Sequence, residues 1–316
     1  MLLEHNPHSF LTGDDPFLEI SPLEATREGT AEEILFETRH EGFVGIPHGG
    51  ISMGLCLDAW RRIGSPAYPV SVRFRFGGSG ITIGDRALFT VEVDRESSEP
   101  CVLAKVTKPG DKTPYLRAEI RSAPDASRSV PVKNPLALDL RKLPYYRNCF
   151  VCGHHRIVPG LQRRFAVDQA NGGYLVATGW GDASDDGDRT KFFLFGREEL
   201  HPAVLISIFD ENTAWAGFML TRSAGLSVRV EFTLMRPVAS HERLLFVSQP
   251  TGIRGNPKAP RFFLAEGTIF SMADPGRPEP VAYGKGEWVV MDQYTSQIKE
   301  NLLPSHDWQW IFGKND

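Results

Sequence analysis

An internal duplication is the feature of this sequence that most constrains its fold. Residues 48–60 are HGGISMGLCLDAW, and residues 201–215 are HPAVLISIFDENTAW. Further matches follow in the same order: SVRFRF and SVRVEF begin at Ser71 and Ser227, DRALF and ERLLF begin at Asp85 and Glu242, and Pro-Gly pairs begin at Pro109 and Pro275. The separation grows from 153 to 166 positions, as loop insertions would make it. These matches indicate a tandem duplication, and therefore two units of one fold.

The composition is that of a globular chain large enough for two domains, since 41% of the 316 residues are hydrophobic and 23% are charged. No stretch approaches the roughly 18 consecutive apolar residues of a membrane helix. The first 17 residues lack the basic start and apolar stretch of a signal peptide, so a cytoplasmic location is expected. The net charge of −4 argues against nucleic acid as the main partner. Four cysteines are too few for a disulfide framework and fit a reducing compartment.

Each unit is predicted to contain a long buried helix among antiparallel strands. The stretch from Gly50 to Ile63 begins at a glycine pair and is apolar on most sides, which is typical of a helix surrounded by other structure. The second helix is expected from about Pro202 to Leu220, with proline in the first turn, where no N–H is needed. Alternation of apolar and polar residues predicts strands at 34–36, 68–76, 86–94, 101–107 and 114–121, and again at 161–167, 173–180, 226–235, 242–249, 261–271 and 280–291.

A proline-rich segment, 126–147, predicts a linker that crosses the surface between two domains, 1–125 and 148–316. Residues 182–197 are predicted to form a long loop before the second helix. The tail from Tyr294 onward is expected to contain a helix and a docking segment, because its aromatic residues argue against a free tail.

This order of elements resembles the hotdog fold, in which an antiparallel sheet wraps around a long central helix. HGG followed by an apolar helix with an acid near its ninth residue, and then a strand of the SVRFRF kind, resembles the acyl-CoA thioesterase superfamily. CFVCG at 149–153, followed by Pro159-Gly160-Leu161 and Phe165, is similar to the opening of some thioesterase-like proteins. The resemblance implies an α+β tandem double hotdog, one chain folded as the two halves of a homodimer. It also implies acyl-CoA or another acyl thioester as substrate, with no cofactor beyond the coenzyme A of the substrate. Because hotdog sheets commonly associate further, association of such chains into a homo-oligomer is a further expectation that the sequence does not decide.

Thioester hydrolysis needs a carboxylate that activates water or attacks directly, and N–H donors for the oxygen that becomes negative. In the resembling families the acid lies nine residues after the histidine of HGG, and the amide that follows this histidine comes from the other subunit. Here Asp210 lies at the acid position of the second copy, but Pro202 offers no N–H. The first copy keeps Gly49 and Gly50 but has Leu57 at the acid position. The resemblance therefore implies one intact composite site of Asp210, Gly49 and Gly50, and a defective twin.

Other acids and polar residues accompany this candidate site. Asp58 is expected to point elsewhere, because a shift of one residue turns a helical side chain by about 100°. Glu211 competes with Asp210 for the catalytic role, and Asp210 itself fits an ion pair with an arginine as an alternative. Asn212 and Thr213 are candidates for positioning water.

Substrate contacts are assigned to residues around the helices. His48 and His201 are expected to hold the loops that precede the helices rather than to transfer protons. Trp215 is a candidate for lining an acyl tunnel, and simple core packing explains it equally well. The same holds for Trp60, Phe218 and Met219.

The phosphates of coenzyme A would suit a compact basic loop. Arg254, Lys258 and Arg261 form such a loop in the sequence, although a solvated loop is the alternative interpretation. Arg229 and Arg236, at predicted strand ends, are further candidates.

Two motifs point to other chemistry. Residues 50–54, GISMG, match the G-x-S-x-G elbow of serine hydrolases, but there the oxyanion loop is a separate segment and the elbow follows a strand. The second copy also has no counterpart of Ser52. Cys149 and Cys152, near His154 and His155, have zinc-like spacing, yet a closed zinc site needs four ligands. With no second CxxC or HxxxH, the sequence predicts two buried thiols in a turn and no metal site.

Three functions remain after these arguments. The first is an acyl-CoA thioesterase with one composite site. The second is an enoyl-CoA hydratase or dehydratase, whose pattern places histidine five residues after aspartate, a spacing that occurs nowhere in this sequence. The third is a non-catalytic acyl or acyl-CoA binding protein, in which Pro202 and Leu57 mark lost catalysis.

Overall fold

The computed structural model of the chain describes residues 10, 17–18, 20–22, 30–43, 45–63, 66–94, 100–123, 140–168, 174–181, 193–195, 198–256, 259–304 and 308–313.

Within these residues, thirteen antiparallel strands form one sheet, in the order β1-β2-β6-β7-β8-β5-β15-β18-β17-β16-β12-β11-β9. The strands of the first half are β1 (Ile20–Pro22), β2 (Thr30–Leu35), β5 (Val70–Phe76), β6 (Arg86–Asp94), β7 (Cys101–Thr107) and β8 (Leu116–Ser122). Those of the second half are β9 (Arg141–Lys142), β11 (Ala166–Asp168), β12 (Leu175–Trp180), β15 (Gly225–Leu234), β16 (Leu244–Asn256), β17 (Ala259–Ser271) and β18 (Glu279–Val290).

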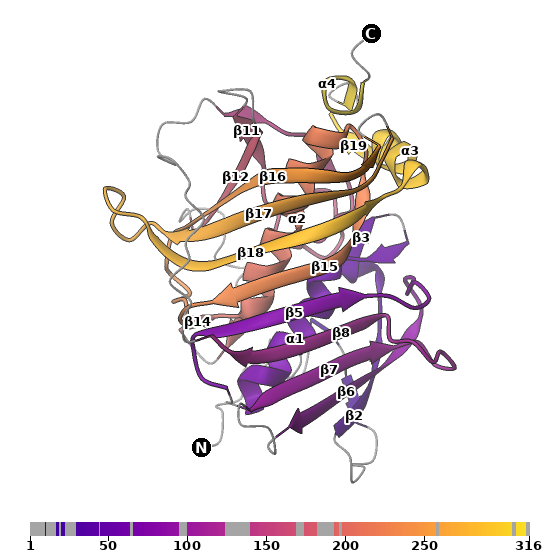
Figure 1. Ribbon diagram of the computed structural model, residues 1–316, viewed down its shortest axis with the longest axis vertical. Helices are drawn as coiled ribbons and strands as arrows, with labels where there is room; N and C mark the ends of the chain where they lie inside the picture. Colours follow the sequence, from indigo (N-terminus) through magenta and orange to yellow (C-terminus); the bar gives the residue numbers. More distant parts are fainter. Residues whose placement is uncertain are drawn as a thin grey trace.

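The two halves join where the matching strands β5 and β15 pair with each other (Figure 1). Val72 lies opposite Phe232 and Phe74 opposite Val230, and these four side chains are buried. Alternate residues such as Arg73 and Glu231 face away from the core, as the period of two in a strand requires. The duplicated SVRFRF-like segments therefore lie at the centre of the molecule, related by an approximate two-fold axis.

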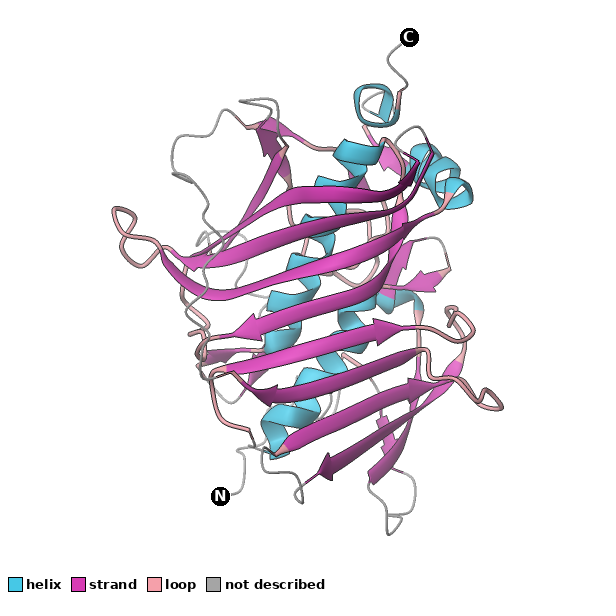
Figure 2. Cartoon of the chain, in the orientation of Figure 1, coloured by secondary structure: helices cyan, strands magenta, loops and turns pink. Residues whose placement is uncertain are grey.

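Two long helices cover the inner face of this sheet (Figure 2). They are α1 (Gly49–Ile63) and α2 (Pro202–Thr221), and they pack against each other. A Cβ atom on Gly50 would lie 2.4 Å from Cα of Ser207, and one on Gly54 would lie 2.5 Å from Cβ of Ala203. The glycines therefore permit a close helix crossing that a larger residue would prevent.

Shorter elements complete the fold. Small two-stranded pairs are formed by β3 (Glu41–Phe43) with β4 (Ile46–Pro47), β13 (Leu194–Phe195) with β14 (Glu199–Leu200), and β10 (Tyr145–Tyr146) with β19 (Leu302–Leu303). A 3-10 turn, η1, spans Thr38–His40, and the C-terminal helices are α3 (Asp292–Asn301) and α4 (Trp308–Phe312).

Most predicted elements are found, with four differences. The predicted loop 182–197 contains the short strand β13, and residues 182–192 and 196–197 lie outside the described residues. The predicted strand 161–167 begins only at Ala166, since the residues before it follow the turn that contains Cys149. The end of the expected linker is structured, because β9 pairs with β11 and β10 pairs with β19. The expected basic loop is instead the end of the β16–β17 hairpin, and Lys258 lies outside the described residues.

The tail docks as predicted, through α3 and α4. The guanidinium group of Arg222, at the end of α2, donates hydrogen bonds to the carbonyls of Trp310 and Ile311 at 2.6 and 2.9 Å. Ile311 and Phe312 are buried. Of the helices described, none has the length and apolar character needed to cross a membrane.

Candidate active site

A cavity of about 430 Å³ lies where the two halves meet. Its wall combines the start of α1, the ends of β5 and β18, the loop that follows β5, the middle of α2 and the start of β15. Most of the wall is apolar, from residues such as Phe76 and Trp288. Its polar groups belong to both halves and include His48, Asp210 and Ser227. A mainly apolar cavity with a few converging polar groups is typical of a binding or catalytic site.

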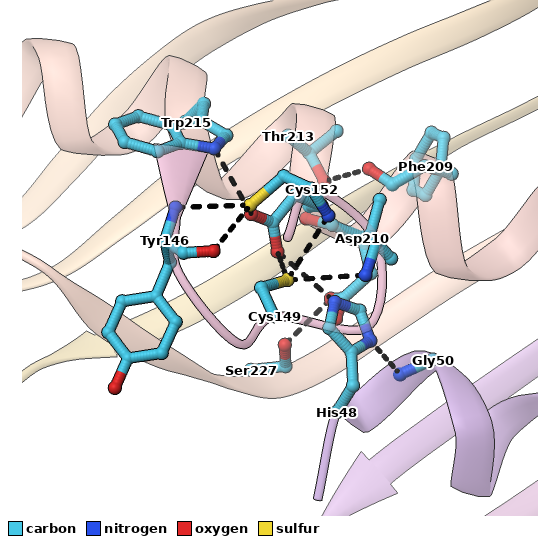
Figure 3. A network of polar contacts seen from close by, with 12 residues as sticks. His48, Gly50, Tyr146, Cys149, Cys152, Phe209, Asp210, Thr213, Trp215 and Ser227 are labelled. Atoms are coloured by element: carbon cyan, nitrogen blue, oxygen red, sulfur yellow. Dashed lines mark hydrogen bonds and ion pairs between the residues drawn. The ribbon is translucent and has the colours of Figure 1, made fainter. Parts of the chain in front are cut away.

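Asp210 and Gly49 meet in this cavity although they come from different copies of the repeat. An ideal Cβ atom on Gly49 would lie 3.3 Å from Oδ2 of Asp210. The other carboxylate oxygen, Oδ1, accepts a hydrogen bond of 2.7 Å from the Ser227 hydroxyl (Figure 3). Oδ2 is therefore the oxygen that faces the start of α1.

Burial raises the pKa of the Asp210 carboxyl above its usual range. The hydrogen bond from Ser227 and the nearby His48 act in the opposite direction, while the Glu211 carboxylate adds to the rise. Such a carboxyl is a stronger base than an exposed one.

The amides of Gly49 and Gly50 have different roles. The Gly50 amide donates a hydrogen bond of 3.0 Å to Nδ1 of His48, so the expected pair of amide donors is corrected to one. The Gly49 amide occupies the first helical position, where no intrahelical acceptor exists. It makes no hydrogen bond to any residue that the structure describes, and Gly49 lines the cavity.

His48 and His201 hold equivalent places at the starts of the two helices. In each ring Nδ1 accepts an amide hydrogen bond of 3.0 Å, from Gly50 and from Ala203 respectively. The imidazole proton therefore lies on Nε2. It is donated to an acid of the opposite helix, to Glu211 Oε2 at 3.1 Å and to Asp58 Oδ1 at 2.9 Å.

Both of these acids lie ten residues after the histidine of their own copy, one position beyond Asp210 and Leu57. As expected, the Asp58 side chain points away from the cavity. It accepts a hydrogen bond from His201 and forms an ion pair with Arg62. Burial by itself would raise the pKa of Glu211, but the hydrogen bonds from His48, Cys152 and Trp215 together outweigh it, and the pKa is lowered. Glu211 is therefore a fixed anion rather than a second base.

The expected water positioners do not face the cavity. The Thr213 hydroxyl donates to the carbonyls of Phe209 and Asp210 in its own helix, at 2.7 and 3.0 Å. The Asn212 amide donates to the carbonyl of Val176 and to the hydroxyl of Ser248. Asn212, two residues after Asp210, lies on another face of α2. Thr213, three residues after Asp210, lies near the same face, but its hydroxyl is engaged within the helix.

The candidates for lining an acyl tunnel are buried core residues and line no part of the cavity, so the core-packing interpretation holds for Trp215, Trp60, Phe218 and Met219. The indole of Trp215 donates to Glu211 Oε1 at 3.1 Å.

The basic candidates for phosphate binding that the structure describes also lie outside the cavity wall. Arg254 forms an ion pair with Glu287, and its guanidinium group lies over the Phe262 ring, as does that of Arg261. Arg236 pairs with Glu242 at 2.7 Å, while Arg229 is exposed on the outer face of β15.

Ser52 is buried one turn inside α1, not at a strand-to-helix turn, so the serine-hydrolase motif is coincidental.

Sequence reasoning missed Ser227 as a functional candidate. Its signal was the first position of the duplicated strand, and the structure adds a register shift between Ser227 and Arg229. Such bulges re-aim side chains near active sites. Tyr115, which follows Pro114 at the start of a strand, also lines the cavity and gave no chemical signal in the sequence.

No family model and no curated protein matches the chain. Similar solved structures include an acyl-CoA thioesterase II of Mycobacterium marinum, with 17% identity and a TM-score of 0.52, covering 87% of this chain and 96% of that one. A hotdog-fold protein of Alicyclobacillus acidocaldarius shares 11% identity at a TM-score of 0.55, covering 86% and 96%. A dehydratase domain of the curacin polyketide synthase shares 12% identity at a TM-score of 0.52, covering 86% and 95%. Together with the two sheet-wrapped helices, these likenesses show that the chain has the α+β double hotdog fold.

Proposed function

We propose that the protein hydrolyses acyl thioesters at the composite cavity between its two halves. The observation that carries this proposal is the approach of the Asp210 carboxylate to Gly49 in a mainly apolar cavity. The Gly49 amide makes no hydrogen bond to any of the described residues. The name of the Mycobacterium marinum thioesterase, which shares this fold, supports the reaction class.

In the proposed reaction, Asp210 acts as general base through Oδ2, because Oδ1 is held by Ser227. A water molecule on Oδ2 attacks the thioester carbonyl carbon and gives its proton to the carboxylate. The carbonyl oxygen, which becomes negative, accepts the Gly49 N–H, assisted by the positive end of α1. The tetrahedral intermediate then expels the thiolate, and Asp210 returns the proton to the sulfur. The products are a carboxylic acid and a free thiol.

The apolar part of the cavity, near Phe76, Tyr115 and Trp288, suits the acyl group. The thiol part of the substrate, coenzyme A in our proposal, leaves through the cavity mouth. The reaction uses no cofactor besides the coenzyme A of the substrate.

The test is release of free thiol from a panel of acyl-CoAs by the purified full chain. We expect turnover of at least one member, and a loss of about 10² to 10⁴-fold in kcat for Asp210→Asn. Asp58→Asn serves as the matched control, because it alters a buried aspartate outside the cavity, and it should keep most of the activity.

Loss of turnover in Asp58→Asn but not in Asp210→Asn would contradict the assignment of the site. If no acyl-CoA is cleaved while acyl-CoAs raise the Tm of the chain, the protein is a binding protein instead.

A further inference from the structure

The turn formed by CFVCG at 149–153 directs backbone amides at two buried sulfurs. Sγ of Cys149 accepts the amides of Val151 and Cys152 at 3.3 and 3.4 Å. Sγ of Cys152 accepts the amide of Tyr146 at 3.4 Å. A thiol is a weak acceptor, and buried amides are rarely left with poor partners. Three amides aimed at two sulfurs therefore suit thiolates, which accept more strongly.

Glu211 brings an oxygen to each of these sulfurs from α2, about 60 residues away in the sequence. Its Oε1 lies 3.2 Å from Sγ of Cys152, and its Oε2 lies 3.6 Å from Sγ of Cys149. A tetrahedral zinc ion with Zn–S of about 2.3 Å and Zn–O of about 2.0 Å separates sulfur and oxygen ligands by about 3.5 Å. The two separations thus bracket the value that such an ion requires.

His48 is the outer partner of this group. Its Nδ1 accepts the Gly50 amide, so Nε2 carries the proton and donates it to Glu211. Donor atoms of His48, Cys149 and Glu211 all lie within 4.8 Å of one another. A ligating carboxylate held by a hydrogen bond from a second residue is a common arrangement at metal sites.

The pseudo-symmetric position shows that the thiols are not needed for the histidine–carboxylate pair. There Asp58 is bound by His201 and by Arg62. The amide of Leu18 donates to the carbonyl of Phe10, and the amide of Leu161 donates in the same way to the carbonyl of Phe150. These equivalent hydrogen bonds align the segment around Phe10 with the segment around Phe150. By this alignment SFLTG of residues 9–13 corresponds to CFVCG, so Ser9 and Thr12 replace the cysteines in the sequence of the first half.

We propose that Cys149, Cys152 and Glu211 bind a thiophilic divalent cation of the zinc class, with His48 orienting Glu211. Binding exchanges two thiol protons for the metal ion, so two protons are released for each ion bound. The cation would fix Glu211 beside Asp210 and tie the turn to α2. The proposal is independent of the thioesterase assignment, since it concerns ligands outside the reacting groups.

The experiment uses the reduced, chelator-treated full chain titrated with Co²⁺ and then with Zn²⁺. We expect one Co²⁺ per chain, with thiolate-to-cobalt charge-transfer absorption that Zn²⁺ abolishes. Cys149→Ser and Cys152→Ser should lose this absorption, while Cys101→Ser, a buried cysteine elsewhere, should keep it. His48→Gln should bind the metal about 10- to 100-fold more weakly.

X-ray absorption of the zinc-loaded natural chain tests the ligands without any variant. Two sulfur neighbours at about 2.3 Å are expected. The proposal is overturned if the reduced chain binds neither metal stoichiometrically, if Cys101→Ser loses the absorption as well, or if the zinc neighbours are only oxygen and nitrogen. The proposal would also be overturned if Cys149 and Cys152 form a disulfide and the chain still binds no metal after that disulfide has been reduced.

Discussion

Two histidine–carboxylate pairs occupy equivalent positions in the duplicated fold. They are His201 with Asp58 and His48 with Glu211. Each histidine caps its own helix and donates to an acid of the other helix. The surroundings differ, because Arg62 compensates Asp58, whereas Glu211 contacts Trp215 and two thiols. The first pair is thus closed within the protein, while the second borders the cavity. Equivalent positions in a duplicated fold can therefore take different roles. One pair only holds the helices together, while the other also forms part of the cavity border.

The largest effect is expected from removal of Asp58. Asp58→Ala leaves His201 and Arg62 without their buried partner, and such losses destabilise by about 3–5 kcal/mol. Urea unfolding measures this cost. Asp58→Asn, which keeps the size and one acceptor, should cost less. If Asp58→Ala changed the free energy of unfolding by less than about 1 kcal/mol, the pair would not hold the two helices as described.

Gly49→Pro gives the first helix the same start as the second, where Pro202 lies. Proline at the first helical position costs no helical hydrogen bond but removes the N–H. We expect kcat to fall by about 10² to 10³-fold, the usual effect of losing an oxyanion donor. Gly49→Ala is the control, since it adds the same Cβ near Asp210 and retains the N–H. Equal losses in both variants would mean that space, not the amide, matters at this position.

Gly50→Ala tests the helix crossing that places the two pairs. The added Cβ would lie 2.4 Å from Cα of Ser207, so the helices must separate. Overpacking of this kind costs about 1–3 kcal/mol. Calorimetry should show a lower Tm, whereas Gly80→Ala, where a Cβ meets nothing within 4 Å, should leave Tm nearly unchanged. An unchanged Tm in Gly50→Ala would show that the crossing tolerates a wider separation.

The smallest expected effect is the pH dependence of stability that Asp58 contributes in acid. Burial raises the pKa of Asp58, but the hydrogen bond from His201, together with Arg62, outweighs it and lowers the pKa overall. A lowered pKa means that Asp58 contributes stability above its unfolded pKa, about 3.9, and that this contribution fades as pH falls through the folded value. The Tm difference between the natural chain and Asp58→Asn should therefore be constant from pH 5 to 7 and shrink in stronger acid. A difference that grows in acid would reverse this sign.

The duplication alone predicted the fold well, because a repeated strand, buried helix and set of strands leaves few ways to form one core. The resemblance to the hotdog thioesterases implied that Asp210 and Gly49 meet although they belong to different halves. The sequence could not show that Nδ1 of His48 accepts the Gly50 amide and so caps the helix, because a side-chain hydrogen bond of this kind leaves no periodic pattern. The roles expected for Asn212 and Thr213 are not supported by the structure. Asn212, two residues after Asp210, lies on another face of the helix, and the Thr213 hydroxyl is engaged by carbonyls of its own helix.

The association of Glu211 with the cysteine pair was also hidden from the sequence. The CxxC motif looked incomplete because its third neighbour lies on α2, in a different segment of the second half. Only the packing of α2 against the turn brings them together. Ser227 was missed for a similar reason, since a bulge rather than strand alternation aims its hydroxyl.

The pairing of β5 with β15 has a consequence for how the protein responds to dilution. When such halves are separate subunits, a cavity shared between them disappears as the dimer dissociates, and its occupancy depends on protein concentration. Here the partners are covalently joined, so their meeting is intramolecular and governed by an effective concentration that dilution does not change. Gly49 and Asp210 therefore stay together at any concentration at which the chain is folded.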